Sequence, residues 1–442
     1  MRIQLSDHFS YRKLLQYTLP SITMLVFTSI YGVVDGFFVS NFVGKTPFTA
    51  VNFIMPVLMI LGSAGFMFGT GGGALIAITM GEGKQKEANH QFSLIVYTAA
   101  ICGIILATLG IVFIRPLAAA LGAEGRLLED SVIYARINLI AIPAYILQFE
   151  FQCLFATAGK PALGLAVTIL AGLTNMGLDA LFVAVFHWGL EGAAAATAMS
   201  QLVGGLVPIL YFARPNGSLL RLGKTGFDGK ALWKACVNGS SELMSNISMS
   251  IVSMLYNVQL LKYAGEDGIA AYGVLMYVSL IFHAVFIGYS VGTAPVISYH
   301  YGAKNRKELK GLLKKSLILI GVFAIVMFGA ADLLTVPLAQ IFVSYDEELF
   351  RLTVRAFRIF SYSFLFAGFA IFGSSFFTAL NNGLISATIS FMRTLIFQIS
   401  AVLIFPIFWK VDGIWASIVA AEMMAVMVTI LFLKAKQKKY QY

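Results

Sequence analysis

The chain has 442 residues, of which 59% are hydrophobic and 12% are charged, and its formal net charge is +10. A soluble domain usually carries about 25% charged residues, so these values exclude an ordinary soluble globular protein. The basic excess would suit either a nucleic-acid-binding protein or the loops of a membrane protein. The distribution of the charges along the chain decides between the two.

Apolar segments of bilayer-spanning length follow one another through the whole chain. About twenty apolar residues cross the hydrocarbon core, and a single segment satisfies its backbone groups there only as a helix. We predict twelve transmembrane helices with the limits 14–36, 51–79, 92–114, 133–156, 162–186, 191–213, 234–260, 268–299, 312–331, 353–379, 384–408 and 413–433.

Two stretches, one in each half of the chain, resemble each other at a distance of 221 residues. The first reads GTGGGALIAITMGEGKQKEA and the second reads SVGTAPVISYHYGAKNRKEL. Identical residues coincide at Gly71 and Gly292, Ile76 and Ile297, Gly81 and Gly302, Lys86 and Lys307, and Glu87 and Glu308. A repeat in so apolar a chain indicates a membrane protein of two homologous halves, and such proteins are most often transporters.

Each predicted half holds six helices, an even number, so both halves enter the membrane in the same direction. The predicted fold is therefore an all-α integral membrane protein whose twelve transmembrane helices form two pseudo-symmetric six-helix lobes around a central cavity. Its predicted parts are an N-terminal lobe (1–213), a linker (214–233) and a C-terminal lobe (234–442). Because each chain holds both lobes, we expect a monomer.

The basic residues gather on one side of the predicted membrane. With twelve spans both termini share that side, which carries about 21 Lys and Arg against about 8 on the other side. The richest clusters are Lys304, Arg306, Lys307, Lys310, Lys314 and Lys315, and the tail residues Lys434, Lys436, Lys438 and Lys439. The positive-inside rule therefore places both termini and the linker in the cytoplasm, and it accounts for the charge without a nucleic-acid partner.

Ionisable residues inside the spans of the first half form the first candidate site. An ionisable side chain in hydrocarbon is costly and usually functional. Asp35 lies late in the helix 14–36, and Asn175 and Asp179 share a face of the helix 162–186 because they are four residues apart. With Thr197 in the helix 191–213, they fall at a similar depth and offer oxygen atoms to a hard cation or to a shared proton. The alternative is that each side chain caps a helix or bonds to a kink.

The second half has fewer polar candidates within its spans. Glu242 lies among Ser240, Ser241, Ser245 and Asn246, a polar stripe that would line a substrate cavity. His283 titrates near neutrality and is a second cavity candidate, although a neutral packing histidine is the simpler interpretation. The sequence leaves the roles of Glu150, close to the end of the helix 133–156, and of Glu422 open.

Other motifs favour structural roles. The glycine run from Gly69 to Gly73 lies inside an apolar span without the context of a phosphate loop, so it favours close helix packing. Cys102, Cys153 and Cys236 are isolated and lack metal-ligand spacing, and no cleavable signal is evident. We find no nucleophile–base constellation and no ATP-binding domain, so we expect neither an enzyme nor a cofactor, and any uphill work would use an ion gradient.

Three segments resemble the MATE (multidrug and toxic compound extrusion) family of transporters. They are PVISYHYGAKNRKELK from Pro295, Pro20 followed by Val34-Asp35-Gly36, and the run from Ala156 to Pro161. The resemblance covers essentially the whole chain and implies a multi-pass antiporter of a bacterial inner membrane. Such proteins export organic, often cationic and aromatic compounds by alternating access, in exchange for H⁺ or Na⁺.

Within that family the chain is similar to the DinF-like and MepA-like bacterial members. The matching motifs imply that Asp35, Asn175, Asp179 and Thr197 form the cation or proton site, and that Pro20 allows its helix to bend. Residues 359–379 contain no acid, which makes a second cation site of the NorM type doubtful. The ion stays open, although burial of both acids in an apolar lobe disfavours their charged forms and so favours H⁺.

Other classes fit the sequence less well. The main alternative is a lipid or lipid-linked glycan flippase of the same superfamily, but such proteins often have fourteen helices and a polybasic cavity. A major-facilitator symporter also has six-helix halves, but the loop GEGKQKEA lacks that family's Gly…Asp-Arg…Gly-Arg-Arg pattern. A receptor or channel of this size would not need such a repeat, although repeats occur in channels too.

Overall fold

The computed structural model describes residues 3–43, 45–344 and 346–442, and the regular structure of these residues is helical, with no strand. The first half contains α1 (Tyr11–Phe38), the π-helix η1 (Val39–Val43), α2 (Lys45–Gly81), α3 (Gln85–Ala120), α4 (Gly125–Thr157), α5 (Pro161–Asp179), the π-helix η2 (Ala180–Val185) and α6 (Gly189–Ala213). The second half contains α7 (Gly229–Gly302), α8 (Arg306–Val343), α9 (Glu347–Ser361), α10 (Phe364–Ala379), α11 (Gly383–Phe391), the π-helix η3 (Met392–Ile396) and α12 (Phe397–Tyr440).

Two of these ribbons are each a pair of helices that meet at a break. Gly265 divides α7 with a φ of 67°, and Lys410 divides α12 with a φ of 49°. Conversely, α9 and α10 form one element with a bend of 49° between its parts. When α11, η3 and the first part of α12 are taken as one helix, the described residues contain the twelve helices predicted from the sequence, and the predicted fold is confirmed.

Most of these helices are apolar enough to cross a membrane. Among the described residues nine helices meet that condition, or ten if α9 and α10 make one span. The number stays below twelve partly because the stretch Gly383–Tyr440 counts once although it is divided at Lys410. The first part of α7 is also not among the nine, and it carries the polar stripe around Glu242.

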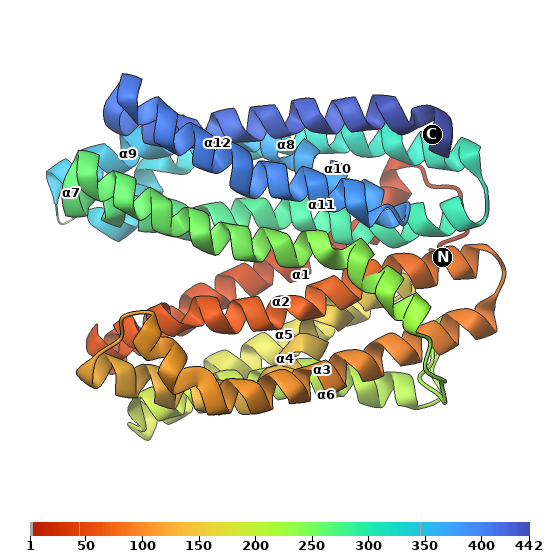
Figure 1. The fold of residues 1–442 in the computed structure, drawn as a ribbon, viewed down its shortest axis with the longest axis horizontal. Coiled ribbons are helices and arrows are strands. Elements are labelled where there is room, and N and C mark those ends of the chain that lie inside the picture. Colours follow the sequence, from red (N-terminus) through yellow and green to blue (C-terminus); the bar gives the residue numbers. More distant parts are fainter. Residues whose placement is uncertain (1–2, 44, 345) are drawn as a thin grey trace.

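The helices form two bundles that lie side by side. In Figure 1 the helices α1–α6, in red to yellow-green, form the lower bundle, and α7–α12, in green to blue, form the upper one. Both chain ends and the non-helical segment 214–228 lie at the same end of the molecule. We call the bundles the N-terminal lobe and the C-terminal lobe.

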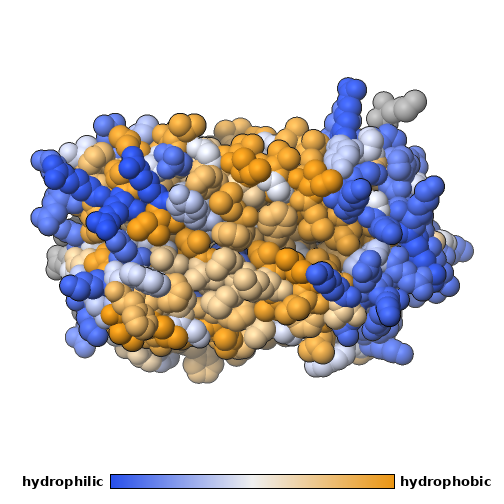
Figure 2. Space-filling view, turned by 90° about the horizontal axis from the view of Figure 1, so that it is seen from above, coloured by the Kyte–Doolittle hydropathy of each residue, from blue (hydrophilic) through white to orange (hydrophobic). Residues whose placement is uncertain are grey.

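The outer surface carries the signature of a membrane protein. Figure 2 shows an apolar belt around the middle of the molecule and polar side chains at both ends, most densely at the end with the termini. Large exposed apolar side chains such as Ile104 and Val112 of α3 and Ile325 of α8 contribute to this surface. Exposure of so many apolar side chains is favourable only next to lipid.

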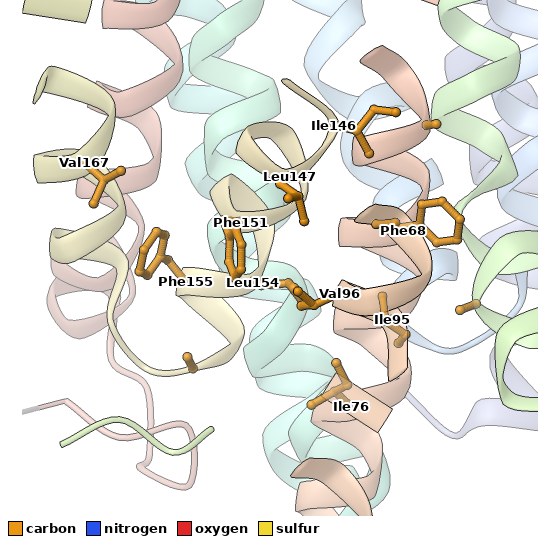
Figure 3. Close-up of a cluster of buried hydrophobic side chains, with 14 of the residues drawn as sticks. Phe68, Ile76, Ile95, Val96, Ile146, Leu147, Phe151, Leu154, Phe155 and Val167 are labelled. Atoms are coloured by element: carbon orange, nitrogen blue, oxygen red, sulfur yellow. The ribbon is translucent and has the colours of Figure 1, made fainter. Parts of the chain in front are cut away.

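Helix α4 lies at the centre of the N-terminal lobe. In its most apolar stretch 78% of the residues are buried, compared with 22% in α8. Figure 3 shows Phe151 and Phe155 of α4 among apolar side chains that include Phe68, Ile95 and Val167. Most side chains in this stretch of α4 are therefore enclosed by the protein, and a buried polar group there needs a specific partner.

The repeat predicted from the sequence produces a symmetric contact between the lobes. A Cβ atom on Gly81 of α2 would collide with the carbonyl oxygen of Tyr299 of α7, and one on Gly302 of α7 would collide with the carbonyl oxygen of Ile78 of α2. Gly81 and Gly302 are 221 positions apart, and so are Ile78 and Tyr299. The two contacts are therefore equivalent: Gly81 packs on Tyr299, and Gly302 packs on Ile78, the residue that corresponds to Tyr299 in the first half. An isologous dimer interface has the same reciprocity.

The N-terminal segment strengthens this contact at the end with the termini. Although it precedes α1 of the N-terminal lobe, its Phe9 N–H donates to Glu308 Oε1 of α8 over 2.9 Å. His8 Nδ1 lies 2.7 Å from Glu308 Oε2, and Lys315 Nζ donates to the carbonyl oxygen of Phe9. We call the glycine contacts and this segment together the seam, because they hold the two lobes together at one end.

Substitution of Gly81 by Ala should destabilise the protein, because the new methyl group meets a backbone oxygen that cannot turn aside. We expect a loss of about 1–3 kcal/mol, measured as a lower melting temperature of the purified protein. Gly329→Ala is the matched control, since nothing lies within 4 Å of the added atom, and alanine is the better helix former. Equal melting temperatures for both variants would contradict the close contact at the seam.

Candidate functional site

The four polar residues selected in the first half lie together. Asp35, late in α1, is 7% exposed, and the hydroxyl of Thr197 on α6 donates to Asp35 Oδ1 over 3.5 Å. The side chains of Asn175 and Asp179, both on α5, also interact with the Asp35 carboxyl group. Three helices of the N-terminal lobe thus bring their polar side chains to one place.

Close packing of α1 against α5 sets the level of these side chains. Gly172 of α5 leaves room for the rings of Phe27 and Tyr31 of α1, and a Cβ atom on Gly172 would collide with them. Asp35 follows Tyr31 by one helical turn, and Asn175 follows Gly172 by about one turn. The two helices therefore present Asp35 and Asn175 at matching depth.

The helices around this site contain π-helical turns. Helix α5 ends at Asp179 and continues directly as η2, and η1 begins at Val39, one turn after Asp35. A π-turn is rare and is frequently found at functional sites, because its wider ring displaces side chains from their ordinary positions. Asn175 and Asp179 are 2% and 0% exposed, so η2 begins directly after a fully buried acid of this site.

Tyr134 of α4 belongs to the same site, and the sequence analysis missed it. Its hydroxyl lies near Thr197 and within the electrostatic field of the Asp35 and Asp179 carboxyl groups, and the side chain is fully buried. A tyrosine in an apolar span is an ordinary membrane residue, so its type gave no signal. The signal that could have pointed to this face of α4 was the polar residue Asn138, one turn after Tyr134 within the same apolar span. Its side-chain amide donates to the Tyr134 carbonyl oxygen.

The site has more oxygen atoms than protein donors. In the described part of the chain both carboxyl oxygens of Asp179, the Asn175 Oδ1 and the Tyr134 hydroxyl are buried without a hydrogen-bond partner. No cationic side chain is among the described groups that act on Asp35. Two neighbouring carboxyl groups in such surroundings repel each other when both are ionised. These oxygen atoms therefore suit a shared proton or a hard monovalent cation, because hard cations prefer oxygen ligands.

The predicted substrate-cavity residues of the second half lie in a separate cluster. Glu242 and His283, both on α7, interact electrostatically with Arg393 of η3. Arg393 Nε donates to Glu422 Oε2 of α12 over 2.7 Å. His283 Nδ1 lies 2.9 Å from the carbonyl oxygen of Ser279, one turn earlier, a contact typical of a packing histidine.

Glu150 and Pro20 complete the residues singled out from the sequence. Glu150 of α4 is fully buried within the protein. The thiol of Cys153 interacts electrostatically with Glu150 of its own lobe and with Glu242 of the other, which places these acids near the boundary between the lobes. Pro20 lies inside α1, which is one helix from Tyr11 to Phe38.

Comparison with known proteins identifies the family. A family model described as MatE matches residues 20–181 and 243–404, one segment in each half of the chain. The multidrug export protein MepA of Staphylococcus haemolyticus (strain JCSC1435) is 26% identical over 319 residues, which cover 72% of this chain and 70% of that protein. MepA of Staphylococcus aureus (strain NCTC 8325 / PS 47) is 22% identical over 418 residues, covering 94% of this chain and 92% of that protein.

Solved structures show the same fold. A crystal structure of MATE in complex with MaL6 has a TM-score of 0.93 at 20% identity and covers 98% of each chain. A multidrug resistance MATE family transporter of the MOP superfamily, in an outward-facing conformation, has a TM-score of 0.92 at 21% identity and covers 98% of this chain and 97% of that one. Since the family model matches most of both halves, this chain belongs to the MATE family of membrane transporters, and it is similar to the MepA members.

Proposed function

We propose that the protein exports organic, often cationic and aromatic compounds in exchange for an inward-moving H⁺ or Na⁺. The observation that carries the proposal is the pair of buried acids Asp35 and Asp179, which have no cationic side chain among their described partners. The relatives MepA are multidrug export proteins, which supports drug-like substrates. Nothing comparable favours the flippase alternative.

Exchange follows when the cation and the substrate use the same carboxyl groups at different times. An ionised Asp35–Asp179 pair attracts a cationic substrate, and this attraction is strong because few polar groups screen it there. Binding of H⁺ or Na⁺ neutralises the pair and removes most of the attraction. The Thr197 hydroxyl, which donates to Asp35, stabilises the ionised form that binds the next substrate.

Alternating access requires that the lobes separate at one end of the molecule at a time. We propose that both termini are cytoplasmic and that the membrane is the bacterial inner membrane, because the basic clusters of α8 and α12 lie at that end. The seam of Gly81, Gly302 and the N-terminal segment then closes the cytoplasmic side, as an outward-facing state requires. Since one chain contains both lobes, a monomer is sufficient for transport.

We favour H⁺ over Na⁺ as the coupling ion. Two carboxyl groups close together share one proton readily, and protonation removes the repulsion without additional ligands. Na⁺ would need several oxygen ligands at once, for which Asn175 and Thr197 are the available neighbours. Both ions act on the same residues, so the experiment below distinguishes them.

Neutralising Asp35 should abolish coupled export. In proteoliposomes with a pH gradient or a Na⁺ gradient imposed separately, we expect one gradient to drive export of a fluorescent cationic dye by the wild type. Asp35→Asn and Asp179→Asn should each lower the driven rate to about a tenth or less, because the amide takes up no proton and carries no negative charge to hold a cation. Asp332→Asn, which changes an exposed acid of α8, is the matched control. Full export by both site variants would rule out this coupling site.

The proposed orientation has its own test. In a variant without Cys102, Cys153 and Cys236, a cysteine introduced at Lys436 should react with a membrane-impermeant maleimide only after the cells are opened. A cysteine at Glu124, in the loop between α3 and α4 at the opposite end, should react in intact cells. The reverse pattern would show that the termini face outward.

A further inference from the structure

Three arginines of α9 lie together at the end of the molecule opposite the termini. Arg351, Arg355 and Arg358 are four and three residues apart, so they share one face of the helix. Figure 1 shows α9 at that end, on the side of the membrane to which the sequence assigns only about 8 Lys and Arg. The positive-inside rule accounts for basic residues at the other end and does not account for these.

The basic residues of α9 also differ in type from those near the C-terminus. Helix α9 contains arginine and no lysine, whereas residues 434–439 contain four lysines and no arginine. Lysine provides a compact charge, which suffices for a topology signal beside anionic lipid. Arginine provides a planar fork of N–H donors that binds a phosphate through two parallel hydrogen bonds. The composition of α9 therefore favours an oxyanion ligand.

The arginines line an open pocket on the exposed face of an amphipathic helix. The opposite face of α9, which includes Leu349 and Phe360, is buried against the protein. The pocket has a volume of about 430 Å³, and Asp412 of α12 is the acid that lines it together with the three arginines. Its remaining lining is apolar and consists of Phe350, Val354 and Ile359. Positive charges beside apolar side chains suit an amphiphilic anion.

The arginines retain donors for such a ligand. Arg351 pairs with Glu347 one turn earlier, and their side chains are 77% and 79% exposed, so this pair contributes little to stability. Arg355 donates to Asp412 Oδ2 and thereby joins α9 to α12. Arg358 is exposed and has no ion pair with any residue that the structure describes. Arg351 and Arg358 are therefore available to an external acceptor.

The depth of α9 matches that of the lipid headgroups. The bent element of α9 and α10 runs from the outer end to Ala379, whose carbonyl oxygen accepts a hydrogen bond from Ser298, close to the seam. About twenty helical residues span the hydrocarbon core, which places its outer boundary near position 359. Arg358 thus lies at headgroup level, and Glu347 lies about three turns further out, toward water.

The neighbouring part of α12 supports this depth. Trp409 precedes the pocket residue Asp412 by three positions, and its side chain is 59% exposed. Exposed tryptophan is enriched at the boundary between hydrocarbon and headgroups. The helix breaks directly afterwards at Lys410, which has a φ of 49°. Both walls of the pocket therefore reach the membrane interface at the same level.

We propose that the pocket between α9 and the break of α12 binds the phosphate of an anionic phospholipid in the outer leaflet. The arginine forks hold the phosphate oxygens, and the apolar lining contacts the glycerol and the upper part of an acyl chain. A free phosphate would use the charges alone, whereas a lipid also uses the apolar lining and the headgroup depth. The inference is independent of what the protein exports, and it uses the orientation proposed above only to name the leaflet.

The informative variant is Arg351→Gln with Arg358→Gln. It removes two charges from the pocket and leaves the bond between Arg355 and Asp412, so the packing of α9 against α12 persists. Replacing the same two residues by lysine keeps the charge and loses the fork. The matched control is Arg115→Gln with Arg126→Gln, which removes two exposed arginines of the N-terminal lobe at the same end of the molecule.

The test measures lipid binding close to the pocket through tryptophan fluorescence. Trp188→Phe with Trp233→Phe leaves Trp409 and Trp415, both near the break of α12. The full-length protein is reconstituted in vesicles of phosphatidylcholine that contain either brominated phosphatidylglycerol or brominated phosphatidylcholine as the quencher. The ratio of the two quenching efficiencies gives the local preference for the anionic lipid. We expect this preference to fall by about fivefold or more in the double Gln variant, and by less in the double Lys variant.

Three results would overturn the proposal. One is an unchanged preference in the double Gln variant. Another is an equal fall in the control variant, which would identify a general effect of surface charge. The third is restored fluorescence on addition of millimolar glycerol 3-phosphate, which would show that the pocket takes a soluble phosphate and not a lipid.

Discussion

A carboxyl group in apolar surroundings stays ionised only if another group or ion compensates its charge. Asp35 and Asp179 are two such groups side by side, without a cationic partner in the described chain. The surrounding structure brings the two groups together, because Gly172 lets α1 and α5 approach closely and η2 begins directly after Asp179. Tyr134 and Thr197 add hydroxyl groups to the same place. We therefore propose that the site takes its partner from outside the protein, and that this partner is a transported H⁺ or Na⁺ held by the buried oxygen atoms.

The two lobes share a backbone plan and differ in chemistry. Reciprocal contacts of Gly81 with Tyr299 and of Gly302 with Ile78 show that the repeat is preserved where the lobes meet. In the fifth helix of each lobe, by contrast, Asp179 precedes one π-turn and Arg393 lies in the other. Two lobes of the same plan that enter the membrane in the same direction can rock against each other as bodies. The N-terminal lobe thus holds the buried acids Asp35 and Asp179, whereas the C-terminal lobe holds the ion pair of Arg393 and Glu422.

The sequence predicted the helices and the four residues of the first site because the bilayer imposes simple rules. Hydrocarbon requires helices of known length, and an acid inside such a helix is rare, so Asp35 and Asp179 stood out by their places within apolar spans. Tyr134 did not stand out, because tyrosine is common in membrane helices and its role depends on which groups it meets. Arg393 lies in a predicted span and was available as a signal, but its partner Glu422 is 29 positions away. Such pairings depend on the tertiary packing of α12 against η3, which no local pattern encodes.

Competition between cation and substrate at Asp35 and Asp179 is the central claim. Its most direct test is the affinity of the purified protein for a cationic dye, titrated against pH and, separately, against Na⁺. For H⁺ coupling the affinity should fall as the pH falls, because protonation removes the negative charge that holds the dye. For Na⁺ coupling it should fall as the Na⁺ concentration rises, and in Asp35→Asn it should respond weakly to both. A wild-type affinity independent of both ions would contradict the account.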